Sequence, residues 1–323
     1  MSNVTVDLSI AIVSYNTRAL LLDCLRSLFE SSLAIRFEVI VVDNDSKDAT
    51  VEAIRTSYPA VHIIVNHENR GFSKGVNQAL EVGTGRYLLM LNSDTRVRRQ
   101  ALDRMVACLD GDPEIGAVGC KQWTENGRLY QSCFPFPSIQ DHLIHASFLR
   151  KCGPAWLEAL AERQAIDCTK SQDVDWINGA CLMVRMDLMR ACGGLDEGYF
   201  MYFEDVDLCR AFHQRGYRIR HLADADIVHL IGRSGERDRL RLNLVWEFSR
   251  IRYVEKHFPL FKRWIMKAWI ALGAVVRLID AIGRRPSAVN NCSLVMCVSV
   301  VRRLWHRSQS VLSGLVWTGP NRG

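Results

Sequence analysis

Short apolar runs alternate with amphipathic segments over the first 110 residues, and this alternation constrains the fold more than any other feature. The runs are continuous rather than interrupted by polar residues, which is typical of strands covered on both faces. They lie at 8–13, 37–42, 61–65 and 86–91. The segments with helical periodicity or helix-start residues lie at 17–29, 46–58, 71–82 and 99–109. Because the connections are short, the sequence predicts an α/β fold with a mostly parallel sheet covered by helices.

The alternation loosens beyond Asp112-Pro113. The further elements predicted are strands at 115–120, 176–184 and 227–230 and a helix at 204–214. Hydrophobic periodicity is weak between residues 131 and 169. We expect this segment to be a variable cover over the ligand site at the strand ends that is described below.

The C-terminal part differs from the rest in charge. Residues 1–230 hold 24 Lys and Arg against 30 Asp and Glu, and residues 231–323 hold 17 against 5. The balances of −6 and +12 make up the net charge of +6. Helical segments are predicted at 240–257 and 260–282, with a weaker one at 294–305.

Within residues 260–282, tryptophans are interspersed with Lys and Arg on an apolar background. This pattern is typical of a helix lying in a membrane interface, where anionic lipid attracts the basic residues. The alternative is a helix packed on the N-terminal α/β domain with a solvated basic face. Nucleic acid is not an expected partner, because no recognition motif accompanies the basic residues.

Composition restricts the class of protein. Apolar residues at 48% supply a full core and exclude global disorder. The 11 cysteines form no C-x-x-C pair and no zinc spacing, so we expect a reducing cytosol rather than a disulfide framework. The N-terminus shows no leader pattern, and no uncharged apolar run reaches the roughly 18 residues of a membrane span.

Polar residues follow three of the predicted strands at the point where each apolar run ends. They are Ser14, Tyr15 and Asn16 after the first, Asp43 after the second, and Asn92, Ser93 and Asp94 after the fourth. Open α/β sheets bind ligands at the carboxyl ends of their strands. The Asp94 carboxylate is suited to bind Mg²⁺ or Mn²⁺ that is held mainly by substrate phosphates. The Asp43 carboxylate can accept a hydrogen bond from an N–H group of a nucleotide base. Taken singly, each group also has the ordinary explanation of a turn or a helix cap.

Two further groups flank predicted helices. Arg70 and Gly71 precede the third helix, where an arginine and free backbone N–H groups suit a diphosphate, although capping explains them too. Glu204 and Asp205 begin a helix after an aromatic run, and burial there would raise a carboxyl pKa to suit a general base. The helix dipole alone also favours acids in a first turn. His229 ends an apolar run and is either a core residue or a metal ligand.

Six short segments occur one after another along the chain. They are Ile12-Val13-Ser14-Tyr15-Asn16, Val41-Val42-Asp43-Asn44-Asp45-Ser46, Asn69-Arg70-Gly71-Phe72-Ser73-Lys74-Gly75-Val76-Asn77, Leu91-Asn92-Ser93-Asp94, Trp176-Ile177-Asn178-Gly179-Ala180 and Phe203-Glu204-Asp205-Val206-Asp207-Leu208. In combination they resemble the inverting family 2 glycosyltransferases of GT-A fold, especially the bacterial rhamnosyltransferase-like branch. The resemblance covers about residues 8–230 and implies a Rossmann-like sheet.

The resemblance also implies a role for each position. On the donor side, Ser14, Tyr15, Asn16 and Asp43 correspond to the base and ribose site, Arg70, Gly71 and Asn77 to diphosphate contacts, and Asn92 and Ser93 to the strand end beside them. On the acceptor side, Trp176, Gly179 and Ala180 correspond to the floor near the sugar, with Glu204 beside the base. Asp205 matches the catalytic base of the family's E-D motif. Asp94 matches the last acid of its D-x-D metal motif, and His229 stands where related transferases supply a metal-binding histidine.

One departure concerns the metal. Asn92 replaces the first acid of the metal motif, which leaves Asp94 as the only carboxylate of that triplet. We therefore expect the site to depend on Asp94, His229 and the substrate diphosphate, with weaker metal binding in the apo protein.

The activity that the resemblance implies is metal-dependent inverting glycosyl transfer. The preferred donor is dTDP-L-rhamnose, and the preferred acceptor is a lipid-linked (polyprenyl-diphosphate) or growing surface polysaccharide, in cell-envelope polysaccharide biosynthesis. We expect a catalytic domain at 1–235, with nucleotide-binding half 1–120 and acceptor half 121–235. The basic helical region, 236–323, would hold the protein peripherally at the cytoplasmic face of the inner membrane.

Three alternatives stay open at this point. The donor is another nucleotide sugar such as a UDP-hexose, or the protein binds a nucleotide sugar without catalysis. A nicotinamide-dependent oxidoreductase also uses a parallel sheet, but no G-x-G-x-x-G follows the first predicted strand.

Overall fold

The structure, a computed structural model, describes residues 6–31, 33–138, 166–230 and 239–284. The chain divides into two compact units. The larger comprises Met1–Phe136 with Gln164–Arg237, and the smaller comprises Pro137–Arg163 with Asp238–Gly323. All the site residues predicted above lie in the larger unit.

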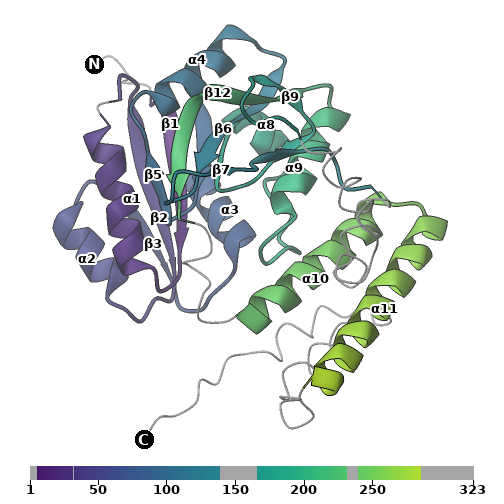
Figure 1. Cartoon of the computed structure of the whole chain (residues 1–323). Helices are drawn as coiled ribbons and strands as arrows, with labels where there is room; N and C mark the ends of the chain where they lie inside the picture. The colour runs from purple at the N-terminus through teal and green to yellow at the C-terminus, as the bar shows by residue number, and fades with distance from the viewer. Residues whose placement is uncertain (1–5, 32, 139–165, 231–238, 285–323) are drawn as a thin grey trace, which may run out of the picture. The chain divides into compact units, whose positions relative to one another are not determined.

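A single mixed sheet forms the centre of the larger unit (Figure 1). Its main strands are β1 (Leu8–Ser14), β2 (Phe37–Asn44), β3 (His62–Asn66), β4 (Tyr87–Leu91), β5 (Thr95–Val97), β6 (Ile115–Trp123), β11 (Cys181–Arg185) and β12 (Arg218–His229), in the order β3-β2-β1-β4-β11-β6-β12-β5. The first four run parallel, as predicted. Strand β11 is antiparallel to both of its neighbours, and β12 is parallel to β6.

Helices cover both faces of this sheet (Figure 1). The helices α1 (Arg18–Glu30), α2 (Thr50–Ser57) and α4 (Ala101–Gly111) pack with the strands into one core cluster. The helices α3 (Phe72–Val82), α8 (Met186–Ala191) and α9 (Glu204–Gln214) contribute to a second cluster. In β4, Leu89 and Leu91 belong to the first cluster, whereas Leu88 and Met90 belong to the second. A strand buried on both sides explains why its sequence reads as a continuous apolar run.

The predicted strand at 176–184 is wrong as a single element. Trp176–Ile177 is β10, which pairs with β8 (Cys133–Phe134) in a separate small sheet, and β11 begins only at Cys181. The three residues between them, Asn178 to Ala180, form a break that apolar periodicity does not reveal. This break lies beside the catalytic candidates described below.

Two boundaries also differ from the prediction. Strand β12 begins at Arg218 rather than residue 227, because it follows β6 through an irregularity between Leu222 and Asp226. Helix α2 begins at Thr50 rather than at residues 46–48. The side chain of Asp48 instead accepts hydrogen bonds from the Thr50 hydroxyl and the Arg18 backbone N–H.

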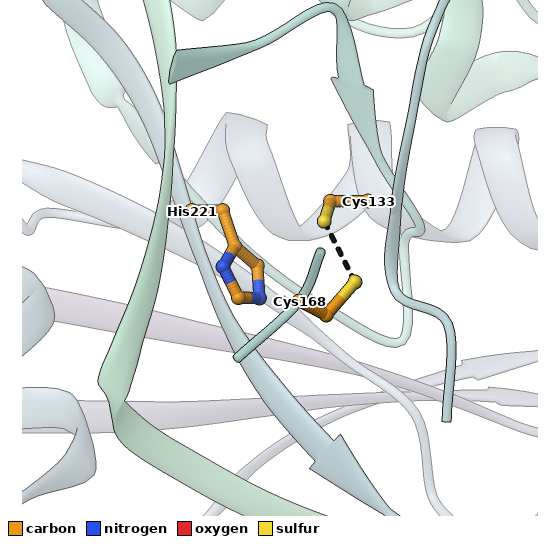
Figure 2. Close-up of side chains that lie close together, drawn as sticks. All are labelled: Cys133, Cys168 and His221. Carbon is orange, nitrogen blue, oxygen red and sulfur yellow. Dashed lines mark hydrogen bonds between the residues drawn. The ribbon is translucent and has the colours of Figure 1, made fainter. Parts of the chain in front are cut away.

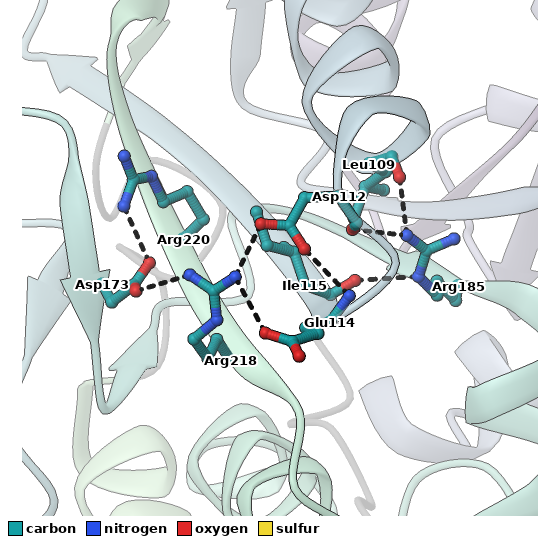
Figure 3. A network of polar contacts seen from close by, with 8 residues as sticks. All are labelled: Leu109, Asp112, Glu114, Ile115, Asp173, Arg185, Arg218 and Arg220. Atoms are coloured by element: carbon teal, nitrogen blue, oxygen red, sulfur yellow. Dashed lines mark hydrogen bonds and ion pairs between the residues drawn. The ribbon is translucent and has the colours of Figure 1, made fainter.

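An ion-pair network joins the start of β12 to neighbouring segments at the opposite end of β12 from His229 (Figure 3). Arg218 contacts Asp112 at 2.6 Å and Asp173 at 2.9 Å, and Arg220 also contacts Asp173 at 2.9 Å. These contacts tie β9 (Gln172–Val174) and the connection after α4 to β12. Because the pairs are partly exposed, they fix geometry more than they add stability.

The smaller unit contains α10 (Arg239–His257) and α11 (Leu260–Arg284), close to the predicted bounds. Lys267 of α11 pairs with Glu255 of α10 at 2.6 Å, and Tyr253 packs against His257 and Phe258. Among the described residues, no helix combines the length and the apolarity needed to cross a bilayer. The predicted helix at 294–305 and most of the predicted cover at 131–169 lie outside the described residues.

Candidate active site

The ends of β1 and β2 form the predicted nucleotide side. Ser14 and Asp43 are register partners on the two strands, and both are buried. The Ser14 hydroxyl is 2.9 Å from the Thr17 hydroxyl. Asn16 has φ 54°, and its backbone N–H donates to the Ser46 hydroxyl at 2.9 Å while its side-chain oxygen accepts from the Lys47 N–H at 2.7 Å. Asn16 therefore joins the two strand-end loops, whereas Tyr15 is partly exposed between them.

Asp43 has one satisfied and one unsatisfied carboxylate oxygen. Its Oδ1 accepts from the Ser46 N–H at 2.9 Å, but buried Oδ2 has no hydrogen-bond partner among the described residues. A buried unsatisfied acceptor is costly unless a ligand completes it. The oxygen is therefore suited to a donor group of a bound molecule, such as a base N–H.

The loop before α3 is held in place by its backbone. Asn44 donates to the Gly71 carbonyl at 3.1 Å, and the Phe72 N–H donates to the Phe200 carbonyl at 2.7 Å. Gly71 has φ 86°, and a Cβ there would lie 2.5 Å from the Phe200 oxygen, so the position requires glycine. Arg70 beside it is exposed, free to reach a ligand at the start of α3.

The Asn77 side chain forms two hydrogen bonds with the backbone of Leu195. Its side-chain oxygen accepts from the Leu195 N–H at 2.8 Å, and its amide nitrogen donates to the Leu195 carbonyl at 2.9 Å. These bonds anchor α3 to the turn that precedes Phe200. The diphosphate contact predicted for Asn77 stays a prediction.

Asp94 and His229 lie together at the edge of the sheet. His229 Nε2 is 3.3 Å from Asp94 Oδ1, and the Leu230 N–H donates to the Asp94 carbonyl at 2.9 Å. Both side chains are buried. Strands β5 and β12, which pair directly, bring together two residues that are far apart in the sequence.

A chain of amides orients the histidine. His229 Nδ1 is 3.2 Å from Gln122 Oε1, and Gln122 Nε2 donates to Asn178 Oδ1 at 2.6 Å. Because an amide oxygen only accepts, Nδ1 carries the proton of this hydrogen bond. The lone pair of a neutral ring is then on Nε2, directed at the Asp94 carboxylate. Two acceptors in contact are stabilised by a shared cation.

Asp205 lies at the other end of the same series of hydrogen bonds. Gly179, which follows Asn178, donates its N–H to Asp205 Oδ2 at 2.8 Å, and the Val206 N–H donates to Oδ1 at 2.8 Å. Burial raises the pKa of Asp205 to about 6, although these two backbone bonds oppose the shift. A carboxyl with a pKa in this range is suited to accept a proton near neutral pH.

Glu204 differs from its neighbour. It is 5% exposed, its Oε2 has no hydrogen-bond partner among the described residues, and burial followed by repulsion from Asp205 raises its pKa well above the ordinary range. The preceding Tyr202 and Phe203 have φ 71° and 68°, a strained conformation for residues with large side chains. This backbone conformation turns the chain so that α9 begins with both acids at the site.

Two tyrosines connect the donor and acceptor sides. The Tyr130 ring meets the His229 ring edge-on with centroids 6.0 Å apart, and its pKa is raised by burial and by the Asp205 charge. The pKa of Tyr202 is raised by burial and by the charges of Glu204 and Asp94. Asp94, His229 and Asp205 therefore belong to one site.

The small sheet beside this site carries the remaining candidates. Trp176 donates its Nε1–H to the Pro135 carbonyl at 2.9 Å and stacks on Phe134 with ring centroids 4.5 Å apart. The buried Ala180 accepts from the Asn92 N–H at 3.0 Å, which joins the break after β10 to the strand end that carries Ser93 and Asp94.

A sequence model described as "Glycosyl transferase family 2" matches residues 9–147. This part of the chain belongs to family 2 of the glycosyltransferases. An N-acetylglucosaminyl-diphospho-decaprenol L-rhamnosyltransferase of Mycobacterium tuberculosis is 28% identical over 228 residues, which cover 65% of this chain and 73% of the relative. The predicted family and its rhamnosyltransferase-like branch are thus confirmed, and with them glycosyl transfer as the class of activity.

Solved structures confirm the predicted GT-A fold. A mannosyltransferase from Pyrobaculum calidifontis, solved with GDP-Man and Mn²⁺, superposes with a TM-score of 0.53 at 17% identity and covers 97% of this chain and 84% of its own. GalNAc-T7, solved with UDP, GalNAc and Mn²⁺, gives a TM-score of 0.51 at 14% identity, over 70% of this chain and 43% of its own.

Four residues of this candidate site were not found from the sequence: Gln122, Tyr130, Asn178 and Tyr202. Asn178 lies inside the Trp176-to-Ala180 segment, and Tyr202 inside the aromatic run before Glu204, so both had a local signal. Gln122 had only the weak signal of an amide near the end of an apolar strand. Tyr130 had none, because its role depends on how β7 (Leu129–Tyr130) pairs with β6.

Proposed function

We propose that this glycosyltransferase transfers L-rhamnose from dTDP-L-rhamnose, with inversion, to a hydroxyl of a lipid-linked or surface-polysaccharide acceptor. The observation that carries the catalytic part is the hydrogen-bonded chain from Asp94 through His229, Gln122 and Asn178 to the residue that holds Asp205. The donor and acceptor rest on similarity to the mycobacterial rhamnosyltransferase.

The nucleotide binds across the ends of β1 and β2 in this proposal. The unsatisfied Oδ2 of Asp43 accepts a base N–H, and partly exposed Tyr15 packs against the ring. Arg70 and the start of α3 face the diphosphate, where N–H groups and the positive end of the helix dipole favour an anion.

A divalent cation fits the pair formed by Asp94 and His229. A carboxylate oxygen and an imidazole lone pair 3.3 Å apart are oxygen and nitrogen donors of a kind that Mg²⁺ or Mn²⁺ accepts, with substrate phosphates completing the set. When bound, such an ion neutralises the charge that develops on the departing nucleoside diphosphate. Both solved neighbours hold Mn²⁺, which supports the same choice here.

Asp205 removes the proton of the acceptor hydroxyl as that oxygen attacks the anomeric carbon. The Gly179 and Val206 N–H groups hold the carboxylate in a fixed orientation, and burial keeps its pKa close to neutral. Attack from the face opposite the nucleotide inverts the configuration in one displacement, with no covalent sugar–enzyme intermediate.

The first test measures nucleoside-diphosphate release from a panel of sugar nucleotides, with Mn²⁺ or Mg²⁺ against EDTA and membrane extract as acceptor. Metal-dependent release from dTDP-L-rhamnose alone supports the proposal. Release from another donor keeps the mechanism and removes the rhamnosyl assignment. Nucleotide binding without release from any donor and with any extract contradicts catalysis.

A matched pair of variants then tests the base. Asp205→Asn should lower turnover about 10²–10⁴-fold while leaving nucleotide binding intact. Asp187→Asn is the control, because Asp187 also lies in a first helical turn and accepts the next residue's N–H at 2.8 Å, but outside the site. Near-normal turnover in Asp205→Asn would remove this residue from the role of base.

The catalytic domain in this proposal spans 1–235, and residues 236–323 associate with the cytoplasmic face of an anionic membrane. Leu260, Phe261 and Trp264 at the start of α11 are 61–77% exposed, and Lys262 and Arg263 lie among them. Apolar rings with adjacent basic residues favour a lipid interface.

Replacing Phe261 and Trp264 by Glu should abolish sedimentation with anionic vesicles, whereas Leu129→Glu, at an exposed position of the catalytic unit, should not. Equal sedimentation of both variants would contradict the proposal.

A further inference from the structure

Two cysteines and a histidine lie close together inside the larger unit (Figure 2), and none of the three is among the residues assigned above. Cys133, Cys168 and His221 are each no more than 2% exposed, and their ligating atoms lie within 4.8 Å of one another. They come from β8, from the segment before β9 and from β12, so three separate stretches of chain converge at this point. The spacing in sequence gives no sign of a cluster.

The histidine has the orientation of a metal ligand. Its Nδ1 is 3.2 Å from the Lys170 carbonyl oxygen, which can only accept, so Nδ1 carries the proton. The lone pair is therefore on Nε2, beside the Ser132 hydroxyl at 3.4 Å. A backbone carbonyl on the far nitrogen is the arrangement that fixes the tautomer of metal-binding histidines. Burial lowers the pKa of His221, which keeps the ring in the neutral form that binds metals.

The two sulfur atoms are 2.8 Å apart, close enough to bind the same ion. The thiolate is the form of cysteine that binds metal. A buried negative charge of this kind is stabilised by a cation.

We propose that Cys133, Cys168 and His221 bind one thiophilic metal ion, Zn²⁺ in the first place. Two thiolates and a neutral imidazole around Zn²⁺ make an uncharged group, which suits a fully buried site. Binding releases the protons of both thiols to solvent, and no electron is transferred. Ser132 Oγ is the adjacent oxygen for a fourth position.

The donor atoms separate this site from the one at Asp94. Sulfur ligands select Zn²⁺ and similar soft ions, whereas a carboxylate with phosphate oxygens selects Mg²⁺ or Mn²⁺. The two sites would therefore hold different metals in the same protein.

The position in the fold suggests what the ion does. Cys133 and Cys168 lie at the two ends of the stretch that joins β8 to β9, and β8 pairs with β10, which leads into Asn178 and Gly179. An ion at this point would fix β8 against β12 and so hold the break that contacts Asp205. Its role would be structural, which distinguishes it from the proposed catalytic ion.

Metal analysis of the full-length protein tests the proposal. After treatment with a chelator under reducing conditions, wild-type protein should take up one equivalent of Zn²⁺ in competition with a chromophoric chelator. With Co²⁺ in its place, we expect a sulfur-to-cobalt charge-transfer band and the visible bands of a tetrahedral site. Absence of both would overturn the proposal without any variant being made.

Variants locate the site. Cys168→Ser and His221→Asn should lose the charge-transfer band. Cys192→Ser, at a partly buried cysteine elsewhere, and Asp94→Asn should keep it. A band that disappears in Asp94→Asn would contradict the assignment.

A thiol count separates metal binding from oxidation. All 11 thiols should react after denaturation of the zinc-loaded protein in the presence of a chelator. Protein isolated without reductant that holds no zinc and has two thiols fewer would show a disulfide between Cys133 and Cys168, and the proposal would be overturned.

Discussion

Gln122 Nε2 donates a 2.6 Å hydrogen bond to Asn178 Oδ1, and this contact joins the two sides of the candidate active site. On one side, Gln122 Oε1 faces His229 Nδ1 at 3.2 Å. On the other, Asn178 precedes Gly179, whose N–H holds Asp205. One amide pair thus sets both the tautomer of the histidine and the position of Asp205, the proposed base.

Gln122→Ala should therefore weaken metal binding. Residues that orient a metal-binding histidine typically contribute about 10–100-fold in metal affinity. We expect a change of that size in the Mn²⁺ concentration for half-maximal activity, with a smaller change in turnover at saturating Mn²⁺. Gln122→Glu keeps an acceptor for His229 and should restore part of the affinity. Gln172→Ala, at a glutamine that bonds a backbone carbonyl in another part of the unit, is the control. A loss of turnover with unchanged metal dependence would contradict this role.

The pH profile should report Asp205. Its pKa is raised to about 6, and a general base must be deprotonated to act. The ratio kcat/KM should therefore rise with pH through about 6 and level off above it. The same acidic limb should persist in Glu204→Gln and be absent from the residual activity of Asp205→Asn. A limb that is unchanged in Asp205→Asn would assign the titration to another group.

Because of Glu204, the free energy of unfolding should fall as pH rises. Its folded-state pKa lies above the ordinary value, so the folded protein binds this proton more tightly than the unfolded chain. Stability is fully present below the unfolded pKa of about 4.3 and is lost as pH rises toward the folded pKa, by about 1.4 kcal/mol for each pH unit that separates the two pKa values. Glu204→Gln should thus be more stable than the wild type at pH 7 and similar at pH 4. Urea unfolding at both pH values measures this difference, and equal gains at both would contradict it.

Gly71 should not tolerate a side chain. Gly71→Ala combines a positive φ of 86° with a Cβ placed 2.5 Å from the Phe200 carbonyl oxygen. Gly127→Ala has a similar φ of 71° but no atom within 4 Å of the added Cβ, so it isolates the backbone cost of about 1–2 kcal/mol. We expect Gly71→Ala to lose about 1–3 kcal/mol more than Gly127→Ala in the free energy of unfolding. Equal losses would indicate that the Phe200 loop moves freely away.

The sequence predicted the parallel half of the sheet well because its signals are local. Continuous apolar runs such as Leu88 to Leu91 record burial on both faces, and helix α9 begins and ends where predicted because acids mark its start and Gly216 its end. The same locality limited the prediction at residues 176–184. There one apolar stretch is shared by two sheets, and burial pattern cannot separate them.

Strand β5 (Thr95–Val97) was not predicted. The sequence alone was enough for the family, for the order of the four parallel strands and their helices over residues 8–109, and for the candidate acids at strand and helix ends. These follow from short-range patterns of polarity and from motifs a few residues long. Folding brings together the distant residues of both sites: Gln122 with Asn178, Asp94 with His229, and Cys133 with Cys168 and His221. Each of these contacts depends on strand register and pairing across 35 to 135 residues, and no local property of the chain records such a distance.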